Sequence, residues 1–129
     1  MSVEALTAET FKEKVFNYSE SNEWKYAGEK PAIIDFYADW CAPCKAVAPV
    51  LEDVSWKFRD DIVIYKVNVD ENQELAGVFN ITGIPSMLFI PMIGPPSMAQ
   101  GAAPRGDIEK AIADIFGIEK EVDEEESGE

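Results

Sequence analysis

The chain has 129 residues, of which 47% are hydrophobic, a composition sufficient for one globular domain with its own core. Its formal net charge of −14 argues against a nucleic-acid partner, because phosphate binding requires clusters of lysine and arginine. With two cysteines and no histidine, the chain lacks the residues for a zinc site of Cys and His alone, and the base of Ser-His-Asp or Cys-His catalysis. We see no membrane span and no signal peptide, so we expect a cytoplasmic location, or a periplasmic one if a signal peptide has been removed.

The first half of the chain predicts a helix, a loop, a strand and a second helix. The first helix begins after Thr7, a good N-cap, and places Phe11, Val15 and Tyr18 on one face. The other elements follow in order: a loop over 19–31, a strand over 32–38 (AIIDFYA) that is buried on both faces, and a helix over 42–59 with a kink at Pro49. We expect Trp24 and Trp56 to be packing residues.

The second half continues the alternation of strands and helices and then forms a hairpin. The predicted elements are a strand over 62–69, a short helix over 73–79, a strand over 86–90, a turn at 94–96, a strand over 97–101 and a helix over 107–117. This order predicts a mixed α/β sheet.

Acidic residues are concentrated at the C-terminus. Seven acids and one base between Glu119 and Glu129 contribute −6 to the net charge. A run of like charges with few apolar residues is typical of disorder. We therefore expect a domain over residues 1–117 and an acidic, disordered tail over 118–129, with docking of the tail as the alternative.

The residues that bear chemistry are Cys41 and Cys44, which the sequence places between the end of a strand and the start of a helix. A disulfide between them closes a four-residue loop and stabilises a fold by only roughly 2 kcal/mol, so it is a poor structural bridge. The N-terminus of a helix favours an anion and lowers the pKa of a cysteine there. We interpret the pair as redox-active. A structural disulfide and a metal site shared between chains are the alternatives.

Residues 35–45 (DFYADWCAPCK) closely resemble the active-site signature of the thioredoxin family. Further similar segments follow in the family's order: residues 65–70 with Lys66, residues 83–86 (GIPS) and residues 100–102 (QGA). The resemblance covers about residues 3–116. It implies the thioredoxin fold, an α/β architecture with a central mixed β-sheet flanked by helices on both faces.

The resemblance also implies a function, protein-disulfide reduction through a reversible Cys41–Cys44 disulfide. It needs no other cofactor and no metal. The expected partners are proteins that contain disulfides, and a thioredoxin reductase as electron donor, with the chain itself a monomer that binds neither nucleic acid nor membrane.

The resemblance assigns roles to four residues. Cys41 attacks the substrate disulfide and Cys44 resolves the mixed disulfide. The chemistry supports this order, since we expect the cysteine nearer the helix start to be better stabilised and more exposed. Asp35, flanked by apolar residues, is expected to be buried and to take the proton of Cys44. Lys66 either pairs with Asp35 or faces solvent.

Substrate binding is expected around Pro85, a cis-proline in the family. Its missing N–H would leave the Ile84 backbone free to pair with an extended substrate. The expected substrate-binding residues are Trp40, Ala42, Pro43, Ile84, Pro85 and Gly101.

Two site positions depart from the usual family pattern, because Ala42 stands where glycine is common and Ser86 where threonine is common. Two other functions remain open at this point. One is an envelope thioredoxin-like reductase, and the other is an interaction module of the same fold whose cysteines are idle.

Overall fold

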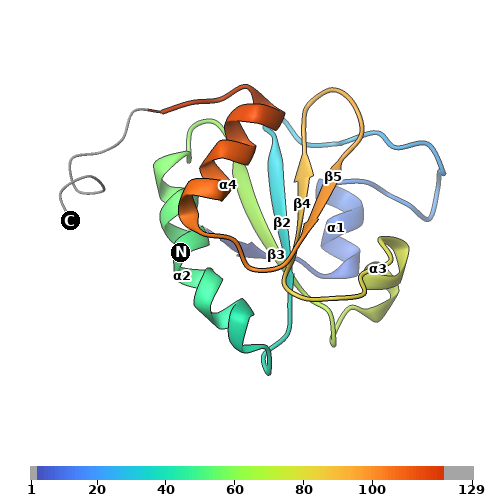
Figure 1. Cartoon of the computed structure of the whole chain (residues 1–129). Coiled ribbons are helices and arrows are strands. Elements are labelled where there is room, and N and C mark those ends of the chain that lie inside the picture. The colour runs from blue at the N-terminus through green and yellow to red at the C-terminus, as the bar shows by residue number, and fades with distance from the viewer. Residues whose placement is uncertain (1–2, 121–129) are drawn as a thin grey trace.

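Strand β2 (Ala32–Tyr37) lies in the middle of a five-stranded sheet in the computed structural model, which describes residues 3–120 (Figure 1). The strand order is β1-β3-β2-β4-β5. β1 (Glu4–Ala5) runs parallel to β3 (Val63–Asn68), and β3 runs parallel to β2. β4 (Ser86–Ile90) pairs antiparallel with β2, and β5 (Ser97–Gln100) pairs antiparallel with β4. The predicted mixed sheet is confirmed. Only β1, which is too short to show a pattern, escaped prediction.

Helices cover both faces of this sheet (Figure 1). One face packs against α2 (Ala42–Lys57) and α4 (Arg105–Ala111), which continues into a π-helical turn, η1 (Ile112–Phe116). The other face packs against α1 (Ala8–Lys14) and α3 (Gln73–Val78). The expected α/β architecture is therefore the observed one. No helix in the described part of the chain has the length and apolar character that crossing a membrane requires.

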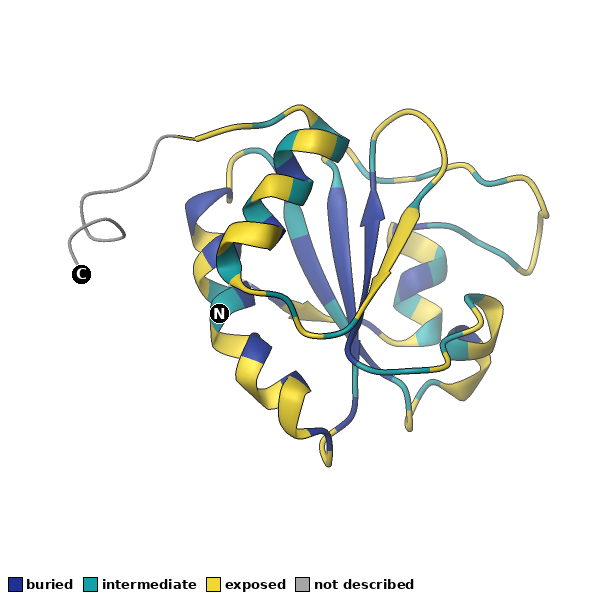
Figure 2. Ribbon diagram, in the orientation of Figure 1, coloured by how far each residue is buried: buried dark blue, intermediate teal, exposed yellow. Residues whose placement is uncertain are grey.

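β2 supplies side chains to both cores. Ile33 lies in the core beneath α2 and α4, whereas Ile34 and Phe36 lie in the core beneath α1 and α3. Because side chains alternate along a strand, Asp35 shares the face of Ile33. Figure 2 shows the three inner strands as mainly buried and β5 as exposed. The strand buried on both faces, predicted from the run AIIDFYA, is confirmed.

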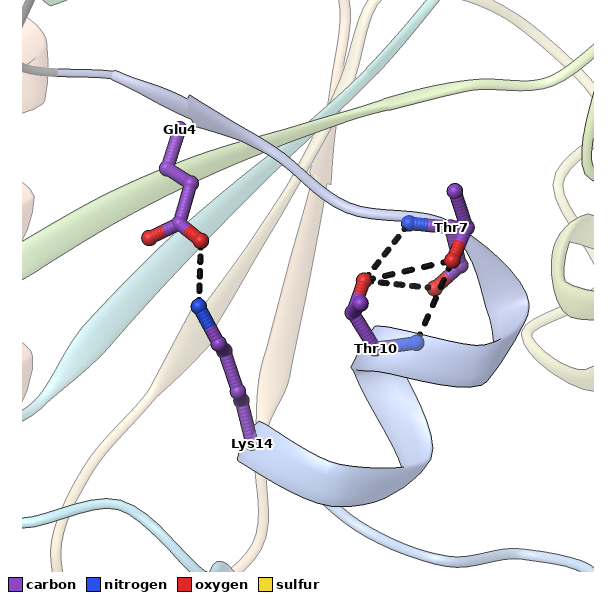
Figure 3. A network of polar contacts seen from close by, with 4 residues as sticks. All are labelled: Glu4, Thr7, Thr10 and Lys14. Atoms are coloured by element: carbon purple, nitrogen blue, oxygen red, sulfur yellow. Dashed lines mark hydrogen bonds and ion pairs between the residues drawn. The ribbon is translucent and has the colours of Figure 1, made fainter.

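The N-terminal helix begins as predicted but ends earlier. Thr7 is its N-cap, accepting a hydrogen bond from the Thr10 N–H, and the Thr10 hydroxyl in turn accepts from the Thr7 N–H (Figure 3). An ion pair between Glu4 and Lys14 joins β1 to the last turn. The helix stops at Lys14, so Tyr18, predicted on its face, instead packs on the same core from the following segment.

Three other expectations concern the remaining helices and the tryptophans. Pro49 lies inside α2, as expected, and the kink expected there stays a prediction. α4 begins at Arg105, two residues earlier than expected, with Pro104 at its N-cap. Trp24 packs against the α1/α3 core as predicted, but Trp56 is 61% exposed and lies under the Arg59 guanidinium, 4.0 Å from its ring centroid. The prediction for Trp56 was wrong because the helical pattern that marks the inner face of α2 does not include it.

The segment just after residue 117 contacts the domain. Ile118 packs against the α2/α4 core, and Lys120 Nζ lies 3.2 Å from the Asp61 carboxylate. The acidic tail that we expect to be disordered spans residues 118–129. Its residues 121–129 lie outside the described residues, so the prediction stays open there.

Candidate active site

Cys41 occupies the N-cap of α2, three residues beyond the last residue of the buried run 32–38. Its sulfur accepts a hydrogen bond from the Cys44 N–H at 3.2 Å, and the two cysteines form a disulfide with their Cα atoms 5.2 Å apart. β2 therefore brings the pair to the end of the sheet, and the first turn of α2 holds both sulfurs. The predicted placement at the junction of strand and helix is confirmed.

The N-cap position favours the thiolate of Cys41 over that of Cys44. The unpaired N–H groups at a helix start and the helix dipole stabilise negative charge. Accessibility, however, does not distinguish the cysteines, since their exposed fractions in the disulfide form are 4% and 3%. The prediction that Cys41 is the more exposed cysteine is therefore not confirmed in this form. Ala42 and Pro43, between the cysteines, are both exposed.

Asp35 is a carboxyl group with an exposed fraction of only 4%. Its Oδ1 is buried without a hydrogen-bond partner, and this burial raises the pKa of the Asp35 carboxyl to about 7. The positive charge of Lys66, its register partner on β3, opposes the rise in pKa only in part. A carboxyl with a pKa near neutrality can accept a proton and return it, which is the property expected of a general base.

Lys66 is half-buried, which lies between the two expectations for it, pairing with Asp35 and facing solvent. Its Nζ lies 5.7 Å from the centroid of the Tyr37 ring, at the end of β2 that leads to Cys41. Its charge acts on Asp35 across the β2–β3 pair. The structure thus brings Asp35 and Lys66 together on the α2 side of the sheet.

The segment from Gly83 to Ser86 lies against the disulfide. Ile84 packs on the cluster of Ala38, Cys41 and Cys44, and the peptide bond between Ile84 and Pro85 is cis, as the resemblance implied. The backbone N–H and C=O of Ile84 bond to no other residue in the described part of the chain. Ile84 therefore presents a free donor and a free acceptor beside the cysteines.

Two hydrogen bonds hold this segment, one from outside it and one within it. The Gly101 N–H donates to the Pro85 carbonyl at 2.7 Å, and the Ser86 hydroxyl donates to the Gly83 carbonyl at 2.6 Å. Gly101 has a φ of +102°, a value that glycine adopts readily and other residues rarely do. The structure thus connects the predicted site residues Pro85 and Gly101 directly.

An apolar groove of about 330 Å³ begins at Trp40. It is lined by Trp40, Val69, Ala76, Ile81, Thr82, Gly83 and Ile84. Trp40 is 70% exposed, and its Nε1 donates to the Asp70 carboxylate at 2.9 Å. Asp70 was not predicted as a site residue. The signal in the sequence is its position two residues after the end of β3, at the end of the sheet that carries the cysteines.

Metal binding finds no support among residues 3–120, where no group of three or more Cys, Asp or Glu side chains could hold an ion. The Cys41–Cys44 disulfide is the chemical group of this site. The family profile of thioredoxin matches residues 2–114.

Individual relatives agree with the family match. The chain is 42% identical to a thioredoxin of Borreliella burgdorferi, over 88% of this chain and 97% of that protein. It is 38% identical to a thioredoxin of Alicyclobacillus acidocaldarius, over 69% of this chain and 85% of that protein. Among solved structures, a chloroplastic thioredoxin z has a TM-score of 0.75 at 26% identity, covering 89% of this chain and 95% of the other.

These comparisons give no support to an envelope reductase or to a module with idle cysteines. The cysteine pair has the family spacing and is joined as a disulfide at the start of α2. We conclude that the chain belongs to the thioredoxin family and is a thiol-disulfide oxidoreductase that reduces protein disulfides.

Proposed function

We propose that the reduced chain acts on a substrate protein in two exchange steps. In the first, the Cys41 thiolate attacks one sulfur of the substrate disulfide. A mixed disulfide forms, and the other substrate sulfur leaves as a thiolate. In the second, Cys44 loses its proton and attacks Cys41 Sγ, which releases the second substrate thiolate. The substrate gains two electrons, its two thiolates take up two protons from water in place of those that Cys41 and Cys44 gave up, and the chain is left with the Cys41–Cys44 disulfide.

The observation that carries this assignment is the position of Cys41 as N-cap of α2. Within residues 3–120, the Cys41 sulfur accepts an N–H bond from the helix start and the Cys44 sulfur accepts none, so the Cys41 thiolate is the better stabilised of the two. The free Ile84 backbone and the apolar groove at Trp40 provide a place for a substrate segment next to it. We assign substrate contact to Trp40, Ala42, Pro43, Ile84, Pro85 and Gly101.

Asp35 is the proposed acceptor for the proton of Cys44. It lies on the α2 side of the sheet, and its raised pKa of about 7 allows it to take the proton during the second step and to release it afterwards. Lys66 acts through Asp35, because its charge sets how strongly the carboxyl holds its proton. We therefore describe Lys66 as a positioning residue.

The electron donor we propose is a thioredoxin reductase. A Mycobacterium leprae relative is a bifunctional thioredoxin reductase/thioredoxin, 35% identical over 69% of this chain, which joins the two activities in one polypeptide. We further propose that the chain works in the cytoplasm. We also propose that it is a monomer, since its charge of −14 opposes self-association. Light scattering of the purified protein would test the monomeric state.

Insulin reduction with dithiothreitol tests the central assignment. We expect Cys41→Ser to remove catalysed turnover, because no nucleophile remains at the helix start. We expect Cys44→Ser to accumulate a mixed disulfide through Cys41, which mass spectrometry of the captured peptide identifies. Thermal melts of both variants control for folding. Capture of substrate by Cys44 in the Cys41→Ser variant, with equal efficiency, would reverse the two roles.

A further inference from the structure

Gln100, the last residue of β5, stands at the end of the sheet that carries the active site. The register pairs Phe36 with Ser86 and Ser86 with Gln100, so the three residues form a row across the sheet near the point where β2 leads to Cys41. The next residue, Gly101, donates its N–H to the Pro85 carbonyl. The backbone therefore fixes Gln100 beside the segment that packs on the cysteines.

The side chain of Gln100 lies over Gly83. A Cβ atom added to Gly83 would overlap the Gln100 amide nitrogen and would stand 3.0 Å from Cδ. Gly83 lines the apolar groove together with Trp40 and Ile84. The absence of a side chain at Gly83 thus makes room for the carboxamide at the edge of this groove.

The carboxamide has no hydrogen-bond partner of its own. Gln100 is exposed, and within residues 3–120 no donor or acceptor bonds to its amide. A primary amide carries both a donor and an acceptor, the same pair of groups that a peptide backbone presents. Two sets of unbonded polar groups, the Ile84 backbone and the Gln100 carboxamide, therefore flank Gly83.

We propose that Gln100 is a specificity-determining residue that hydrogen-bonds the backbone of the polypeptide segment flanking the substrate disulfide. This inference rests on the proposed function, in which that segment pairs with Ile84. An extended segment that is bonded to Ile84 and continues along Gly83 would bring its backbone to the carboxamide, which lies over Gly83. The contact favours disulfides within extended polypeptide over small disulfides, which have no backbone to offer.

The Gln100→Met variant tests the proposal, because methionine keeps the length of the side chain and removes the amide. With insulin as substrate, we expect KM to rise about three- to tenfold, the value of one ordinary hydrogen bond, while kcat changes little. With the small aromatic disulfide 5,5′-dithiobis(2-nitrobenzoate), the rate should stay that of the unmodified protein. Ser97→Val, at the far end of the same exposed strand, is the matched control and should change neither rate.

The outcomes separate this inference from the proposed function. If Gln100→Met leaves KM for insulin unchanged while the unmodified protein reduces insulin, the inference is wrong and the proposed function stands. If the variant slows both substrates equally, Gln100 only supports the Gly83 segment, and the inference is again wrong. If the unmodified protein does not reduce insulin, the proposed function itself fails.

Discussion

The two faces of the central sheet are built from the same strands but contain different kinds of residue. On the α1/α3 face, β2 contributes Ile34 and Phe36, and Phe36 meets Phe79 with ring centroids 5.9 Å apart. On the α2/α4 face, the residue between them, Asp35, is a carboxyl group with an unbonded, buried oxygen. Among the described residues, the α1/α3 side also buries one unbonded polar atom, the uncharged Trp24 Nε1, but only the α2/α4 side buries an unbonded ionisable group, which is the more costly to remove from water.

This difference shows where the fold accepts a loss of stability for the sake of chemistry. A carboxyl group whose folded pKa is about 7, against an ordinary value of 3.8, destabilises the folded state by up to about 4 kcal/mol above neutral pH. Phe36, one residue later, contributes a similar amount in the opposite direction. This buried carboxyl lies on the face covered by α2, the helix that carries the cysteines, as expected where a costly buried group serves function.

The largest effect should come from the apolar face. Phe36→Ala removes a fully buried ring, so we expect the free energy of unfolding to fall by about 3–5 kcal/mol, measured by urea denaturation. Phe36→Leu, which keeps most of the volume, is the control and should cost much less. A loss below 1 kcal/mol for Phe36→Ala would show that the α1/α3 face is not the stabilising one.

The next effect concerns rate on the other face. Asp35→Asn removes the proton acceptor of Cys44, so we expect resolution of the mixed disulfide to slow about 100-fold at pH 7. Rapid-quench measurement of the mixed disulfide isolates this step from the attack by Cys41. Unchanged resolution, with attack slowed instead, would place the function of Asp35 at the other cysteine.

A smaller effect should follow from Lys66→Met. The charge of Lys66 lowers the pKa of Asp35 against the larger effect of burial, so its removal should raise that pKa further. The pH profile of the resolution rate should then move to higher pH. Lys25→Met removes an equal charge from an exposed loop position and is the matched control. Identical profiles for both variants would show that Lys66 does not act on Asp35.

The smallest effect is expected at the hydrogen bond between Trp40 and Asp70, which is exposed to water at the edge of the groove. Asp70→Ala removes the acceptor, and we expect a stability change of no more than about 1 kcal/mol. KM for insulin should rise modestly, since Trp40 loses one restraint on its position. A large drop in the melting temperature would contradict this, because it would mean that the bond supports the fold as well as the groove.

Much of the fold was predictable because strong local patterns agree with the tertiary structure. The run AIIDFYA identifies a strand buried on both faces, and the cysteine pair identifies the start of α2. β1 was missed because two residues show no periodicity. Trp56 was misassigned because an aromatic residue on a helix is buried only if its face is, and its ring instead packs against Arg59.

The site was predictable in its chemistry but not in its surroundings. The cysteines and Asp35 can be found from residue type and local context. The Trp40–Asp70 bond and the position of Gln100 over Gly83 depend on how β3 and β5 meet distant segments. Such contacts leave no local pattern in a single sequence. The equal burial of the two cysteines likewise depends on distant segments, since Val69 and Ile84 pack against the cluster that contains both.

The most direct test of the stability–function trade is the free energy of unfolding of the unmodified chain and of Asp35→Asn as a function of pH. A raised carboxyl pKa means that the folded state keeps its proton while the unfolded state loses it. The stability of the unmodified chain relative to Asp35→Asn should therefore fall from near pH 4 until somewhat above pH 7, and then level off. Other titrating groups are common to both proteins and cancel in the difference.

We expect that relative loss to reach several kcal/mol, about 4 at most, by pH 8.5. The reference is the difference between the two proteins at pH 4, so any effect of the amide on packing does not enter. If the difference in unfolding free energy does not change between pH 4 and pH 8.5, Asp35 titrates as it does in the unfolded chain. The α2/α4 face would then incur no electrostatic cost, and the contrast between the two faces would be wrong.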